Sequence, residues 1–144
     1  MSTVSARASD AWHGKGRVRD ALATEGERTY AMFSHLTLIA AHFGVPIAPA
    51  LIMWLIKRHD TPFVEDHCRE ALNFQISLLV YAVVLVPLGL VTCGVGWVLY
   101  LPLYALGVVG MVLAAVAAHR GEYFRYPMCL RWVRECRRAD SVRA

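Results

Sequence analysis

Five polar side chains recur at helical spacing where this 144-residue chain turns apolar: His67, Glu70, Asn73, Gln75 and Ser77. Side chains three and four residues apart lie on neighbouring positions of a helix, so most of this cluster shares one face. One interpretation is a polar pocket at a membrane edge that binds an ion, a headgroup or a partner peptide. The other is a set of hydrogen bonds from Glu70, Asn73 and Gln75 to a broken neighbouring segment. We favour the second, because such bonds commonly join membrane helices.

Three histidines are the candidate metal ligands. His35 and His42 are seven residues apart and lie on similar faces of a continuous helix, and His67 is the third imidazole. Imidazole suits zinc, copper or iron, but this spacing does not force the three rings together. We therefore predict no metal and no cofactor.

Motifs for catalysis are missing from the sequence. It has no GxSxG, no HExxH and no phosphate-binding glycine loop. The four cysteines form no CxxC pair, which argues against a zinc site or a disulfide framework. We expect a protein that is not an enzyme.

The elements that must position these residues are set by where charge is missing. No Asp, Glu, Lys or Arg occurs in the 28 residues between Arg28 and Lys57, or in the 49 between Glu70 and Arg120. A small soluble domain needs charged faces toward water, whereas a membrane helix needs about 20 apolar residues. The sequence predicts an all-α integral membrane protein with apolar segments at about 30–56, 72–91 and 95–118. Gly110, Ala114 and Ala118 in the third segment let another helix approach closely.

The first apolar segment is interrupted by Gly44, Pro46 and Pro49. Prolines inside a helix remove a backbone donor and kink or break it. The segment is either one long kinked crossing or two half-helices that enter and leave by one side. A full crossing places the two chain ends on opposite sides, whereas re-entry places all 15 Lys and Arg residues on one side. The positive-inside rule makes the C-terminus cytoplasmic in both cases and is cleaner for re-entry, which we favour slightly and which predicts self-association.

The flanks of the membrane domain, residues 29–138, carry further signals. Residues 1–28 and 139–144 are polar, and we expect them to be disordered. Thr61 and Pro62 predict the N-terminus of a helix. Residues 127–138 are expected to form a basic amphipathic helix on the membrane surface, where the arginines meet anionic headgroups rather than nucleic acid. We also predict an interfacial anchor, formed by Tyr123, Phe124, Arg125, Tyr126 and Trp132.

Two motifs resemble a widespread family of small bacterial membrane proteins. They are Asp60-Thr61-Pro62-Phe63-Val64-Glu65-Asp66-His67 with Glu70-Ala71-Leu72-Asn73-Phe74-Gln75, and Gly121-Glu122-Tyr123-Phe124-Arg125-Tyr126-Pro127. Ser34-His35-Leu36 and Trp54-Leu55-Ile56-Lys57 match as well. The resemblance is to the Tic-twenty-like group, whose relatives include MamF-type magnetosome membrane proteins, and it covers about residues 30–133. It implies a small multi-pass membrane protein but no established reaction and no catalytic residues.

These observations favour a multi-pass protein of a bacterial inner membrane. Its leading function is a non-enzymatic assembly or scaffold component that associates with itself or with other membrane proteins. The alternative is an oligomeric transport or protein-translocation element, and a membrane metal-binding protein or enzyme comes third.

Overall fold

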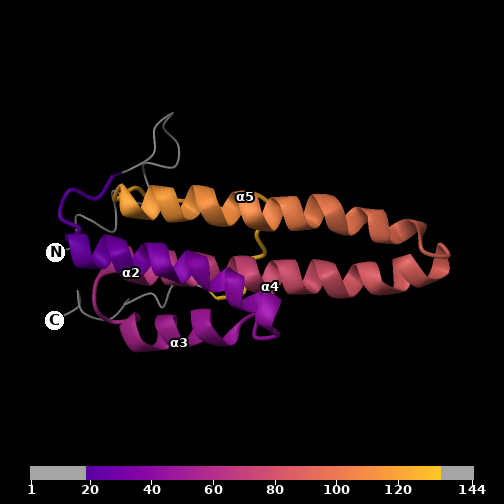
Figure 1. Ribbon diagram of the computed structural model, residues 1–144. Helices are drawn as coiled ribbons and strands as arrows, with labels where there is room; N and C mark the ends of the chain where they lie inside the picture. The colour runs from indigo at the N-terminus through magenta and orange to yellow at the C-terminus, as the bar shows by residue number, and fades with distance from the viewer. Residues whose placement is uncertain (1–18, 134–144) are drawn as a thin grey trace, which may run out of the picture.

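The fold is known from a computed structural model that describes residues 19–133. Its elements are all helical: α2 (Glu25–Leu36), η2 (Thr37–Phe43), α3 (Ala48–Lys57), α4 (Pro62–Val91), η3 (Val95–Leu99) and α5 (Tyr100–His119). In Figure 1, α4 and α5 form a long antiparallel hairpin, and α2 and α3 lie along one half of it. The predicted all-α class is confirmed.

The hairpin consists of two helices that are long and apolar enough to cross a membrane, Pro62–Val91 and Val95–His119. Helix α4 begins as the sequence predicts, with the Thr61 side chain accepting a hydrogen bond from Val64 N and Pro62 at the first helical position. The turn between the helices contains two residues with positive φ, Cys93 at 50° and Gly94 at 96°.

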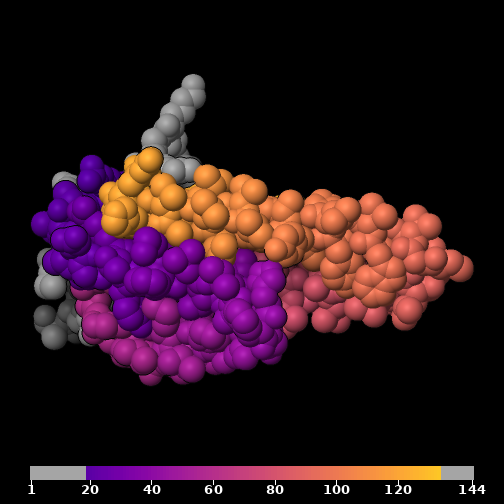
Figure 2. Space-filling view, viewed as in Figure 1, coloured from indigo at the N-terminus to yellow at the C-terminus, as the bar shows by residue number. Residues whose placement is uncertain are grey.

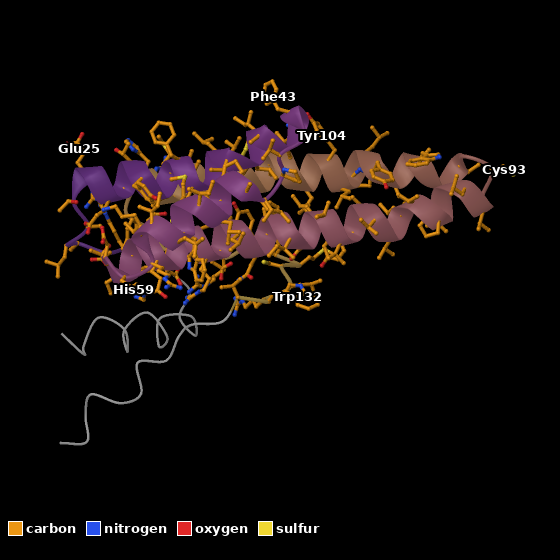
Figure 3. The ribbon with its side chains drawn as sticks, turned by 90° about the horizontal axis from the view of Figure 1, so that it is seen from below. Glu25, Phe43, His59, Cys93, Tyr104 and Trp132 are labelled. Carbon is orange, nitrogen blue, oxygen red and sulfur yellow. The ribbon has the colours of Figure 1, made fainter. Side chains whose placement is uncertain are left out.

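The first apolar segment folds back on itself beside this hairpin. The chain leaves the helical conformation at Gly44, where φ is 79°, and α3 starts four residues later with Pro49 in its first turn. Glu25 and His59 therefore lie at one end of the molecule, Cys93 at the other end and Phe43 between them (Figure 3). The Tyr30 hydroxyl of α2 donates to the Met53 carbonyl of α3 at 2.8 Å, which joins the two helices of the folded-back segment.

Residues 20–28, which were expected to belong to a disordered N-terminal tail, are part of the fold. Asp20 N donates to the Gly121 carbonyl at 2.8 Å, and Ala23 is buried. Helix α2 starts at Glu25 because Thr24 and Glu27 form a capping box, in which each side chain bonds the backbone N–H of the other residue. The rest of the expected tail, residues 1–18, lies outside the described residues.

The amphipathic helix expected over 127–138 is not present in its described part, residues 127–133. Met128 has a φ of 59°, which breaks a right-handed helix at its second residue. Side chains of α4 also bond the backbone of this stretch, as described below, in place of helical neighbours. The remainder, 134–138, and the expected disordered end, 139–144, lie outside the described residues.

Burial is concentrated in the half of the hairpin that α2 and α3 cover. Every buried residue of α4 except Gly89 lies between Phe63 and Ser77, and the buried residues of α5 start at Gly107. Beyond these positions the hairpin exposes large apolar side chains, such as Val83 and Leu101. In the space-filling view the molecule is broad where α2 and α3 lie and narrow toward the turn (Figure 2).

Candidate functional site

One face of α4 holds the segment that follows α5, which we call the strap (residues 121–133). Asn73, Ser77 and Tyr81 stand on this face at four-residue spacing. Each of them bonds the strap's backbone. Asn73 Nδ2 donates to the Val133 carbonyl at 3.0 Å, while its Oδ1 accepts from Val133 N at 2.8 Å.

Two further hydrogen bonds to the strap follow along α4, in the direction of its C-terminus. Ser77 Oγ accepts from Leu130 N at 2.8 Å, and the Tyr81 hydroxyl donates to the Met128 carbonyl at 2.7 Å. Backbone that is not helical leaves its N–H and C=O groups without regular partners, and in apolar surroundings each unpaired group costs several kcal/mol. The polar side chains of α4 supply those partners. We call Asn73, Ser77 and Tyr81 the α4 ladder.

Charged residues extend the same face toward the start of α4. Arg125 of the strap donates to both carboxylate oxygens of Asp66, at 2.6 and 2.7 Å, and its Nη1 lies 3.0 Å from Glu70 Oε1. Arg69 bonds Asp66 at 2.8 Å, and Arg131 lies 3.8 Å from Glu70. Because both carboxylates are buried and paired with arginine, this cluster works as an ion-paired clamp on the strap.

A neighbouring face of α4 holds the broken segment. The Gln75 amide lies 2.7 Å from Thr37 Oγ1, before the break. When the amide is rotated to exchange its oxygen and nitrogen, the nitrogen donates to the Pro46 carbonyl. The amide oxygen then accepts from Leu38 N at 3.2 Å. Gln75 therefore contacts the chain on both sides of the break at Gly44.

A chain of three buried rings links α4, α2 and the strap. His35 Nε2 lies 2.9 Å from His67 Nδ1, and the Tyr126 hydroxyl lies 2.9 Å from His35 Nδ1. Each imidazole can donate from one ring nitrogen and accept at the other, and the Tyr126 hydroxyl can do either, so the three side chains form one continuous hydrogen-bonded chain.

The three candidate metal ligands are not brought together. His35 and His67 bond one another, whereas His42 lies in η2 with its Nε2 3.3 Å from the Tyr104 hydroxyl. Among residues 19–133 no group of three or more His, Cys, Asp or Glu side chains is arranged to hold a metal ion.

The strap's aromatic residues differ from the expected interfacial anchor. Phe124 and Tyr126 are buried, and Tyr126 stacks on Phe74 with ring centroids 3.7 Å apart. Tyr123 packs edge-on against Phe63, whereas Trp132 is 65% exposed. The difference arises because the strap turns back along α4 after α5, where its backbone bonds α4 side chains.

Sequence reasoning found the five members of the polar cluster but missed their partners. Asp66, Tyr81 and Thr37 were not singled out, although Asp66 lies four residues before Glu70 and Tyr81 four residues after Ser77. That spacing was the available signal.

The family of the chain follows from a comparison with protein-family models. The model of the magnetosome magnetite crystal formation protein family, MamF/MmsF, matches residues 26–133. The chain belongs to this family. No curated protein and no solved structure matches the chain.

The MamF/MmsF match spans every element described above, from α2 through the strap. The resemblance to MamF-type magnetosome membrane proteins is thereby confirmed, and membership of the broader Tic-twenty-like group stays a prediction. The chain's membership of a family of membrane proteins indicates a membrane protein. Its two helices that are long and apolar enough to cross a bilayer indicate the same.

Proposed function

We propose that this MamF/MmsF protein is a non-enzymatic assembly component of the magnetosome membrane and acts there in magnetite crystal formation. The family match supports the assignment to magnetite crystal formation. The α4 ladder supports the non-enzymatic role, because its polar groups are bonded to the strap's backbone.

The arrangement we propose in the membrane has two crossings, α4 and η3–α5. The α2–α3 hairpin and the strap then enter from one side and return to it. The described Lys and Arg residues lie at the broad end, and the turn at 92–94 carries no charge. The positive-inside rule makes the broad end cytoplasmic and gives both tails the same side. We expect the protein to insert first into the cytoplasmic membrane of the bacterium.

Self-association is the second part of the proposal. His42 and Tyr104 form a hydrogen-bonded pair on the outside of the molecule, and Tyr104 is 59% exposed. Polar groups facing lipid are costly and tend to be covered by protein. Crosslinking in native membranes is expected to trap a dimer or larger oligomer, and His42→Leu with Tyr104→Phe is expected to reduce its yield. An equal yield from that variant contradicts this part of the proposal.

The cellular test is deletion of the gene in a magnetite-forming bacterium that carries it. Electron microscopy is expected to show fewer or smaller crystals, with recovery when the full-length gene is restored. A fluorescent fusion is expected to lie along the magnetosomes. Unchanged crystals and a fusion spread evenly over the cell membrane contradict the proposal.

The same deletion strain separates an assembly role from a catalytic one. His67→Gln and Glu70→Gln change the only ionisable members of the predicted polar cluster while keeping hydrogen-bonding groups in place. If the protein folds and crystals are normal in both variants, the assembly role stands. Loss of crystals with a normal amount of folded protein would instead favour chemistry at these side chains.

A further inference from the structure

The two halves of the molecule differ in cross-section. In the half near Arg120, α2, α3 and the strap pack beside α4 and α5, and the buried residues of α4 apart from Gly89 lie from Phe63 to Ser77. In the half near Cys93, only two helices are present, and Gly89 and Gly96 are the buried residues between 79 and 106. With a helix about 10 Å across, the broad half occupies roughly twice the area of the narrow one.

Both folded-back segments end at a similar depth. The α2–α3 hairpin turns where His42 meets Tyr104, and the strap turns where Met128 meets Tyr81. At helical rise, Tyr81 and Tyr104 each lie about 15 Å along the axis from the turn at 92–94. A hydrocarbon core is about 30 Å thick, so both segments stop near the middle of a bilayer whose far surface lies at that turn.

The outer surface of the broad half is apolar and faces lipid. Helix α3 exposes Ile52, Leu55 and Ile56 at 53, 48 and 66%, and Phe33 of α2 is 53% exposed. A domain lying outside the membrane would instead present charge to water. The extra volume therefore sits inside one leaflet.

We propose that this protein is a wedge in one leaflet and prefers, or produces, membranes curved away from its broad end. Added area in one leaflet expands that leaflet relative to the other, and the strain is relieved when the expanded leaflet becomes the convex one. Insertion into one side of a bilayer is sensitive to curvature for this reason. The proposal rests on the two-crossing arrangement and goes beyond the role in crystal formation.

The native Cys93 reports which way the wedge is inserted, because it is exposed at the narrow end. A protein retaining only this cysteine, with Cys68→Ala, Cys129→Ala and Cys136→Ala, is reconstituted by one procedure into small sonicated and large extruded vesicles of the same lipids. An impermeant maleimide is added before and after detergent lysis. In small vesicles the broad end should face outward, so Cys93 labelling before lysis should fall by roughly twofold relative to large vesicles.

The matched control places the reporter at the broad end, as His59→Cys in a protein that also carries Cys93→Ala. Its labelling before lysis should rise in small vesicles as that of Cys93 falls. Equal labelling in both vesicle sizes, or the opposite change, overturns the wedge.

A third reporter, Ser5→Cys, distinguishes failure of the wedge from failure of the two-crossing arrangement on which it rests. If it labels together with position 59, the first segment re-enters and the size dependence alone decides the proposal. If it labels together with Cys93, the first segment crosses fully, and both the two-crossing arrangement and the wedge are overturned. The deletion experiment on crystals tests the magnetosome role by itself.

Discussion

Asn73 is the most specifically placed polar residue of the α4 ladder. Both ends of its amide bond the same residue, Val133, much as two backbones pair in a sheet. The only other side chain with an amide is glutamine, which is longer by one methylene.

Replacing Asn73 by leucine removes both bonds and keeps the branching and the number of side-chain heavy atoms. Val133 then keeps two backbone groups without partners in apolar surroundings, and we expect a loss of about 2–3 kcal/mol in the free energy of unfolding. Thermal unfolding in detergent, followed by circular dichroism, measures this. The control is Val84→Leu, at a side chain 63% exposed to lipid, which should change stability little. Equal stability of the two variants would show that the strap is not held by Asn73.

The clamp on Arg125 predicts an unequal pair of carboxylate variants. Asp66 takes two of the arginine's bonds, whereas Glu70 takes one at 3.0 Å. Asp66→Asn should therefore cost about 3 kcal/mol and Glu70→Gln about 1 kcal/mol, because only the first removes the bidentate partner of a buried charge. The same unfolding assay compares them, and a greater loss for Glu70→Gln would contradict the geometry.

At the scale of elements, α5 meets its neighbours through small residues. A Cβ added to Gly110 would lie 3.0 Å from the Phe74 ring and 3.1 Å from the Tyr126 ring. Gly110→Ala should force these stacked rings apart and destabilise the protein by about 1–3 kcal/mol. Gly26→Ala is the matched control, because a Cβ there meets nothing within 4 Å and alanine favours the helix. The order of melting temperatures tests this, and a Gly110→Ala protein as stable as the control would be evidence against close packing.

The start of α2 depends on its capping box. Thr24→Ala removes the side chain that bonds Glu27 N, and we expect a loss of about 1 kcal/mol. The backbone N–H of Thr24 lowers the pKa of Glu27, so the carboxylate's contribution is present at neutral pH and is lost as pH falls through that lowered value. The stability advantage of the wild type over Glu27→Gln, measured by unfolding at neutral and acidic pH, should therefore shrink in acid. An advantage that is constant with pH would assign the cap to Thr24 alone.

Elements were more predictable from sequence than the contacts between them. The start of α4 at Thr61 and Pro62 and the turn at Gly94 follow from local rules, since capping and positive φ depend on a few adjacent residues. The break at Gly44 was visible, but the direction of the chain after it was not, because this depends on Gln75, 29 residues away from Pro46. The strap shows the limit most clearly. Arg131 and Trp132 suit a surface helix by composition, whereas Asn73, Ser77 and Tyr81 bond the backbone of that stretch in a conformation that is not helical.

At the scale of the whole molecule, the strap closes the broad half. A chain ending at Gly121 lacks the partners of the α4 ladder and of Asp66. We expect it to insert its α4–α5 hairpin, since both helices keep their apolar length, but to unfold at a lower temperature than the Asn73→Leu protein. Membrane extraction and thermal unfolding test the two halves of this prediction. If the truncated chain is as stable as full-length protein, the strap does not stabilise the fold.

The position of the strap at the end of the family domain has a consequence for biosynthesis. Residues 128–133 leave the ribosome after α4 and α5, yet they complete bonds to side chains made some 50 residues earlier. During synthesis α4 therefore enters the bilayer with Asn73 and Ser77 still open, and the hairpin must wait with polar groups that lack their final partners. We therefore expect the broad end to be completed only after the hairpin has inserted, so that a factor acting on the newly inserted chain would meet the α4 ladder without its strap partners.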